Sequence, residues 1–124
     1  MKTEREIFIK SIQSLAESVY DFHDRWNLIN YNKPSHEVMK ERKELLAEEV
    51  NELNQEIDKT DELKSIKLLC REAADVLYVS VGHLLALGKD GLEAIDQVSL
   101  KNNKKTNKTH FFDKKVKKVK KLNI

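Results

Sequence analysis

One segment of the sequence, about residues 62–87, is apolar over most of a helix surface and needs other helices to cover it. Residues 63–88 read LKSIKLLCREAADVLYVSVGHLLALG, and Asp75 is the only formally charged residue between Ala73 and Gly88. The chain has 124 residues with three Gly and one Pro, which favours helices over a sheet because turn signals are scarce. The pattern therefore predicts one helical domain built around this segment.

Further helices are predicted on both sides of the central one. Residues 3–25 and 36–58 place apolar side chains every three to four positions, which is helical spacing. The only Pro lies in the connection between them, and Ser35 is the expected N-cap of the second helix. A short fourth helix is expected over about 91–104. The predicted fold class is all-α, a bundle of four to five helices with antiparallel neighbours and short loops.

The ends and the packing of the central helix are also predictable. Asp61 is its expected N-cap, and Gly88 is its expected C-terminal stop. Gly82 is expected to allow close approach of another helix, and His83 to be a satisfied core or interface histidine. Because the apolar surface of this helix exceeds what three companions of its length can cover, we expect a homo-oligomer.

Charge is divided unevenly along the chain. Residues 101–124 hold ten Lys and one Asp, about +9, whereas the remaining 13 basic and 20 acidic residues leave residues 1–100 at about −7. We expect a folded domain at 1–105 and a lysine-rich tail at 106–124, as an added strand, a helix extension or a disordered end. A basic tail suits phosphate groups, nucleic acid or an anionic surface, and it is often only a solvated end.

Several features predict a cytoplasmic protein without a membrane partner. The single cysteine, Cys70, cannot form an internal disulfide, and we expect it to be a small core residue. The N-terminal sequence shows no apolar signal core. The longest uncharged run, residues 76–88, has 13 residues, which is too short to span a bilayer.

Carboxylates lie at the margins of two predicted packing faces. On the second helix, Glu49 and Glu52 are about 60° apart at the edge of the apolar stripe, and Glu48 lies further out. On the central helix, Glu72 and Asp75 repeat this spacing within the apolar face. If the two helices pack antiparallel, four or five acids converge. They cannot all ionise in a dry site without a cation.

The ligand types restrict the choice of cation. Hard oxygen ligands without His or Cys indicate Mg²⁺, Mn²⁺ or Ca²⁺ rather than zinc or copper. Four or five carboxylates exceed what one Mg²⁺ requires, which favours two or more ions around a polyphosphate. The alternative is a solvated acidic helix face, with Glu72 paired to Arg71 of a neighbouring chain or to a lysine across from it.

The acids and their surroundings resemble the all-α nucleoside triphosphate pyrophosphohydrolases, which include MazG-like, dimeric dUTPase-like and phosphoribosyl-ATP pyrophosphohydrolase enzymes. E-E-x-x-E in AEEVNEL and E-x-x-D in REAADVLY carry the resemblance. VYDFHDRW, ADVLYVSVGHLLALGKD and QVSLKNNKK are similar to further stretches of one MazG-like branch. These stretches span residues 19–105 in the family's order. The resemblance implies a MazG-like bundle that forms homodimers, sometimes homotetramers, with sites at the subunit contacts.

The resemblance also implies an activity, which is hydrolysis of a (deoxy)nucleoside triphosphate to the monophosphate and pyrophosphate with Mg²⁺, Mn²⁺ being the alternative. Glu48 then matches an additional ligand or the base that orients the attacking water. Asn102 and Lys105 match positions expected to reach the phosphates or the sugar. Four acids match the metal ligands: Glu49, Glu52, Glu72 and Asp75.

The substrate is the least constrained part of this prediction. His23 and Trp26 lie in FHDRW, where they would either contact the base or pack a helix end on the core. This stretch resembles the dUTPase-like side, which favours a dUTP- or dCTP-type substrate, with phosphoribosyl-ATP as the alternative. Lys101 departs from the serine of the family pattern S-N-x-x-K. The competing functions are nucleic-acid binding through the tail, and a catalytically dead relative, although none of the five acids is missing.

Overall fold

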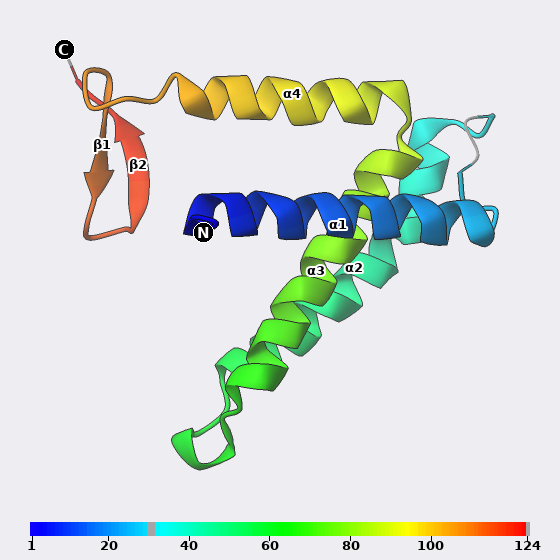
Figure 1. Cartoon of the computed structure of the whole chain (residues 1–124), viewed down its shortest axis with the longest axis horizontal. Coiled ribbons are helices and arrows are strands. Elements are labelled where there is room, and N and C mark those ends of the chain that lie inside the picture. Colours follow the sequence, from blue (N-terminus) through cyan, green and yellow to red (C-terminus); the bar gives the residue numbers. More distant parts are fainter. Residues whose placement is uncertain (30–31, 124) are drawn as a thin grey trace.

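The computed structural model describes residues 1–29 and 32–123, and most of them are helical (Figure 1). The prediction of a mainly helical chain is confirmed, and a β-hairpin forms where the sequence had left a strand, a helix extension and disorder open. Residues 30 and 31, in the predicted connection between the first two helices, lie outside the described residues. The elements are α1 (Glu4–Arg25), α2 (Ser35–Ile57), the short 3₁₀ turn η1 (Asp61–Leu63), α3 (Ile66–Ala86), α4 (Lys89–Asn103), β1 (His110–Asp113) and β2 (Lys118–Lys121).

Two predicted helix caps are wrong. Ser35 is the first residue of α2, and Pro34 precedes it without a side-chain capping bond. The fixed φ of proline suits this entry into a helix. α3 begins at Ile66 because Ser65 acts as its N-cap, with its hydroxyl accepting a hydrogen bond from the backbone N–H three residues on. Asp61 instead begins the 3₁₀ turn, so the connection between α2 and α3 is longer than predicted.

Two glycines fix the turn from α3 into α4. Gly88 has φ 68°, a left-handed conformation that ends α3, so its prediction as the helix stop is confirmed. Gly91, in the first turn of α4, lies so close to α3 that a Cβ there would be 2.1 Å from the Leu84 carbonyl oxygen. The start of α4 is therefore held tightly against the end of α3.

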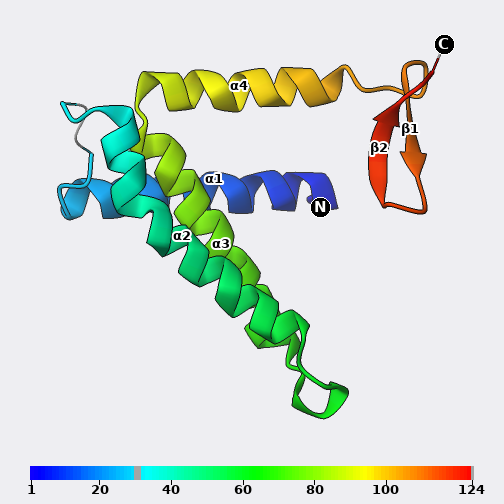
Figure 2. The ribbon, with the colours of Figure 1, turned by 180° about the vertical axis from the view of Figure 1, so that it is seen from behind.

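α2 and α3 form an antiparallel helical hairpin, and α1 crosses α3 (Figures 1 and 2). Within the described part of the chain, α4 packs only against α3 and extends away from the α2–α3 pair. The β1–β2 hairpin follows α4 and packs against no described helix. The predicted antiparallel arrangement thus holds for α2 and α3, while α4 and the hairpin stand apart from them.

A polar junction joins α1, α2 and α3 where they meet. Arg42 of α2 donates from Nε to Nδ1 of His83, 3.1 Å away, and its Nη2 lies 3.2 Å from Nε2 of His23. Nδ1 of His23 is 2.7 Å from the carbonyl oxygen of Val19. A Cβ at Gly82 would be 2.7 Å from the His23 ring, so this glycine permits the close approach, as predicted. His83 is a buried and hydrogen-bonded histidine, which was also predicted.

Few hydrophobic side chains are fully buried within the described residues. Val19 is, and Ala86 is 6% exposed, whereas Cys70, expected in the core, is exposed because its side of α3 is not covered. Large apolar side chains on α1 and α4 also face outward, including Phe8 at 66% and Leu92 at 54% exposure. A domain of this size that folds alone buries roughly two thirds of its surface. The predicted homo-oligomer, which stays a prediction, would cover this surface.

Candidate metal centre

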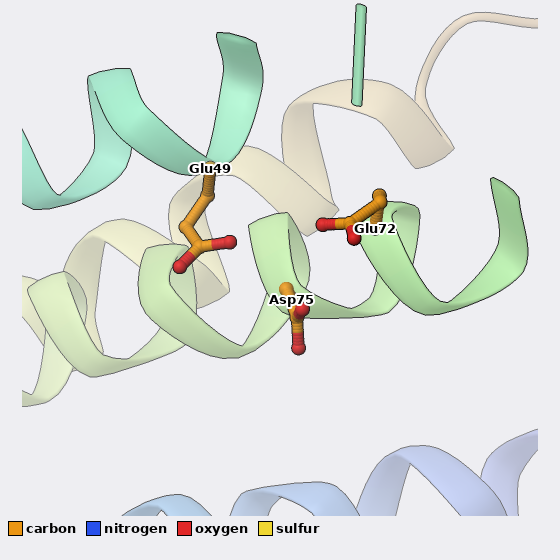
Figure 3. A group of neighbouring side chains, drawn as sticks. All are labelled: Glu49, Glu72 and Asp75. Carbon is orange, nitrogen blue, oxygen red and sulfur yellow. The ribbon is translucent and has the colours of Figure 1, made fainter. Parts of the chain in front are cut away.

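Three of the predicted acids converge between α2 and α3 (Figure 3). Glu49 extends from α2 toward α3, and Glu72 and Asp75 lie on neighbouring turns of α3. One carboxylate oxygen from each lies within 4.8 Å of the other two. The i,i+3 spacing of Glu72 and Asp75 places them on one side of α3, and the antiparallel packing brings Glu49 to that side.

Buried oxygen atoms in this group lack partners. Oε2 of Glu49 and Oε2 of Glu72 are both inaccessible to solvent and accept no hydrogen bond. A buried carboxylate oxygen without a partner is costly, and a cation is one of the few groups that can satisfy several at once. The residues therefore fit a hard divalent cation, whose preferred ligands are oxygen atoms.

The pKa of Glu72 is consistent with a cation site. Burial raises the pKa of its carboxyl group above the ordinary glutamate range, and the negative charge of Glu52 raises it further. A hydrogen bond between the Glu52 and Glu72 side chains and the charges of Asp75 and Glu56 act in the same direction. Glu52 thus reaches the cluster through Glu72, although it is itself exposed.

The structure adds one acid that the sequence analysis missed. Glu56 lies one turn beyond Glu52 on α2, its side chain is 9% exposed, and its Oε1 is buried without a partner. Its Oε2 forms an ion pair with Lys59. The continued i,i+4 spacing from Glu52 to Glu56 was the available signal. Glu48, by contrast, is exposed and lies outside the group of three.

Asn102 and Lys105 lie on a different part of the chain. Asn102 is near the end of α4, where its side-chain amide donates to the Val98 carbonyl oxygen at 3.0 Å. Lys105 follows α4 and is half-buried. Among the described elements, α4 packs only against α3, and no hydrogen bond or ion pair of the described residues joins Asn102 or Lys105 to the acids. Within one chain, these two residues are therefore separate from the acidic cluster.

His23 and Trp26 occupy the end of α1 rather than the acidic cluster. His23 is 3% exposed, and both of its ring nitrogens are hydrogen-bonded inside the polar junction with Arg42. This placement favours the packing alternative for His23. Trp26 is 62% exposed, with its ring 6.4 Å from that of Phe22, so its surface is open to a ligand or to another chain.

Comparison with known proteins gives one match. The family model of the MazG nucleotide pyrophosphohydrolase domain matches residues 36–111, which is more than half of the chain and includes all five predicted acids, Asn102 and Lys105. His23, Trp26 and most of the β-hairpin lie outside the matched region. No curated protein and no solved structure matches the chain significantly. No helix in the described ranges has the length and hydrophobicity needed to cross a membrane.

Proposed function

Since the chain belongs to the MazG nucleotide pyrophosphohydrolase family, we propose that it hydrolyses (deoxy)nucleoside triphosphates to monophosphates and pyrophosphate with the help of a divalent cation. The observation that carries this proposal is the convergence of Glu49, Glu72 and Asp75, with buried carboxylate oxygens that have no protein partner. A purely structural acidic cluster would be expected to pair these oxygens with lysine or arginine.

The proposed cation ligands are Glu49, Glu72 and Asp75, together with Glu52 through its contact with Glu72. All offer hard oxygen atoms, so Mg²⁺ is the proposed ion and Mn²⁺ the alternative. When bound, such an ion supplies positive charge that neutralises the phosphates and stabilises the transition state. In the proposed site, Glu56 adds a further negative charge near Glu72 and forms an ion pair with Lys59.

The proposed reaction is attack of water at the α-phosphorus. An oxygen–phosphorus bond forms, the bond from the α-phosphorus to the bridging oxygen breaks, and pyrophosphate leaves. Glu48 is exposed on the turn that also carries Glu49, where it can orient the water and accept its proton. Asn102 and Lys105 are proposed to bind the phosphates, with Lys105 balancing the charge of the departing pyrophosphate.

Self-association is part of this proposal. Asn102 and Lys105 are apart from the acids within one chain, and α1 and α4 expose apolar rows. A homodimer or homotetramer would cover these rows and bring α4 of one copy to the acids of another. The nucleotide would then bind at a contact between subunits, in a protein expected in the cytoplasm.

A substrate panel tests the proposal and its finer parts. The panel contains ribonucleoside and deoxyribonucleoside triphosphates and phosphoribosyl-ATP, each incubated with Mg²⁺ and with EDTA, and pyrophosphate release is measured. We expect Mg²⁺-dependent release, with dUTP or dCTP the best substrate because FHDRW resembles the dUTPase-like branch. Preference for phosphoribosyl-ATP would select the alternative substrate. Absence of release from every compound by the folded, cation-loaded protein would contradict the proposed activity.

A further inference from the structure

The β1–β2 hairpin is a well-formed element, although most of it lies beyond the region that matches the family. Its strands pair antiparallel with Phe112 opposite Val119, and Lys117 takes a left-handed φ of 57° in the turn. Asp113 ties the two strands together through an ion pair with Lys120 at 3.0 Å. This chain therefore carries a specific structure where a charged tail would otherwise be expected.

The hairpin has no packing partner within the described part of its own chain. It packs against no helix and stands beyond the end of α4 (Figures 1 and 2). On one face, Phe112 and Val119 lie opposite each other and are 54% and 52% exposed. A two-stranded hairpin is marginally stable in water unless one face packs on something else. The Phe112–Val119 face is thus an apolar surface that needs a partner.

Charge narrows the identity of that partner. Residues 101–124 carry about +9 and residues 1–100 about −7, so the helical part of another copy is complementary to the hairpin. A nucleic acid is also negative, but the acidic helical part of the same chain would repel it. The charge distribution therefore favours a second copy of the chain over a polyanion.

A second copy also supplies an apolar counterpart. Phe8 and Ile12 lie one turn apart on the same face of α1 and are 66% and 38% exposed. A phosphate backbone offers no such surface. We propose that the hairpin is a clasp between subunits, with the Phe112–Val119 face packed on Phe8 and Ile12 of a second copy, whose residues 1–100 carry the complementary overall charge. This inference rests on the self-association proposed above.

The test compares two substitutions in the full-length chain. Phe112→Ser removes the aromatic side chain from the proposed contact face, and Phe111→Ser removes the same side chain from the opposite face of the same strand, where it is 44% exposed. Sedimentation velocity over a series of concentrations gives the dissociation constant of the oligomer. We expect Phe112→Ser to raise it at least about tenfold and Phe111→Ser to change it less than about threefold. Equal association of Phe112→Ser and the unchanged chain would overturn the clasp.

Hydrogen exchange tests the clasp without any substitution. In the unchanged chain, amides of residues 110–121 should exchange more slowly as rising concentration drives association. Exchange that is independent of concentration, or that slows only when an oligonucleotide is added, would overturn the clasp, the latter in favour of nucleic acid. A chain that stays monomeric would overturn both the clasp and the proposed self-association, whereas an oligomer that tolerates Phe112→Ser overturns the clasp alone. Pyrophosphate release is measured separately and tests the proposed hydrolysis independently of the clasp.

Discussion

At the scale of single residues, Glu49 and Glu72 lie where their negative charges are expected to destabilise the folded chain. Glu49 and Glu72 each keep a buried oxygen without a partner, and burial together with neighbouring acids raises the pKa of Glu72. Removing one negative charge should relieve this repulsion, whereas a bound cation should relieve it for the whole cluster. The residues proposed to hold the cation are therefore expected to destabilise the metal-free chain.

Glu72→Gln tests whether the charge of Glu72 destabilises the metal-free chain. The amide keeps the shape of the side chain and removes its charge, so we expect the free energy of unfolding in EDTA to rise. Mg²⁺ should then stabilise the variant much less than the unchanged chain. Urea unfolding with EDTA and with Mg²⁺ measures both effects, and Glu44→Gln, at an exposed position on α2, is the control. Equal stabilisation of Glu72→Gln and the unchanged chain by Mg²⁺ would contradict this account.

The polar junction makes a second residue-scale prediction, on pH. Burial lowers the pKa of His83 below the ordinary histidine range, and the charge of Arg42 and the neighbouring His23 lower it further. The unfolded chain then binds this proton more readily than the folded one. The contribution of His83 is complete above the unfolded pKa of about 6.5 and is lost as the pH falls through the lower folded value.

The denaturation midpoint in urea, measured between about pH 8 and pH 5, checks this sign. The part of the midpoint that His83 contributes should be lost with decreasing pH in the unchanged chain and in His36→Gln, whose histidine is exposed. His83→Gln should show a shallower dependence, because it lacks the titrating group. The same steepness in His83→Gln as in His36→Gln would show that His83 does not carry the effect.

At the scale of elements, α4 is attached through its first turn. Gly91 lies against the Leu84 carbonyl oxygen, and no other described element packs on α4. The proposed cation ligands lie on α2 and α3, which pack on each other independently of α4. A change in the first turn of α4 should therefore separate the placement of Asn102 and Lys105 from the cation site.

Gly91→Ala should move α4 away from α3, since its Cβ would overlap the carbonyl oxygen, at a cost of about 1–3 kcal/mol. We expect faster hydrogen exchange in α4 and reduced turnover, with Mn²⁺ affinity of the cluster changed by less than about tenfold. Glu93→Ala, at an exposed position in the same helix, is the control. Loss of Mn²⁺ binding in Gly91→Ala would mean that α4 supports the cluster after all.

Periodicity was enough to predict the helices but not their ends. The spacing of apolar residues predicted α1 and α2, because burial of one face requires that spacing, and the apolar surface of residues 62–87 predicted α3. Ser35 and Asp61 were wrong caps because capping depends on the backbone angles of the cap residue, and Ser65 has the extended conformation required. The hairpin stayed undecided because alternating Val and Lys fits a strand, while its turn depends on the positive φ of Lys117.

In the candidate site, the sequence likewise predicted which residues share a helix face, but not which residues of two helices meet. The i,i+3 spacing was enough to place Glu72 and Asp75 on one side of α3, and the antiparallel hairpin brings Glu49 to them. Glu56 was missed because its burial depends on which turn of α2 meets α3, and the sequence alone does not specify that register. The partners of His23 depend on the same crossing, since Arg42 comes from a different helix.

At the scale of the whole molecule, little hydrophobic surface is removed from water within the described chain. Val19 and Ala86 are its buried hydrophobic residues, while α1, α4 and the hairpin expose others. Anything that binds the folded chain but not the unfolded one stabilises it, and a second copy is such a ligand. Thermal stability should therefore depend on protein concentration.

We expect the midpoint of thermal unfolding to rise by several degrees over a hundredfold increase in protein concentration. Circular dichroism at 222 nm at each concentration, with different path lengths, measures it. Phe112→Ser should show a lower midpoint at high concentration and little difference at low concentration. A midpoint that does not vary with the concentration of the unchanged chain would contradict the proposed self-association.

The central claim is that the converging acids hold the cation on which hydrolysis depends. The most direct measurement is kcat for pyrophosphate release by Asp75→Asn and by Glu49→Gln, with Mg²⁺ and the best substrate of the panel, against Glu44→Gln as control. We predict that kcat falls by at least about a hundredfold in both variants while Glu44→Gln is unaffected, because removing a central ligand disables the site rather than weakening substrate binding. A near-normal kcat in Asp75→Asn or Glu49→Gln, with only KM raised, would contradict the claim.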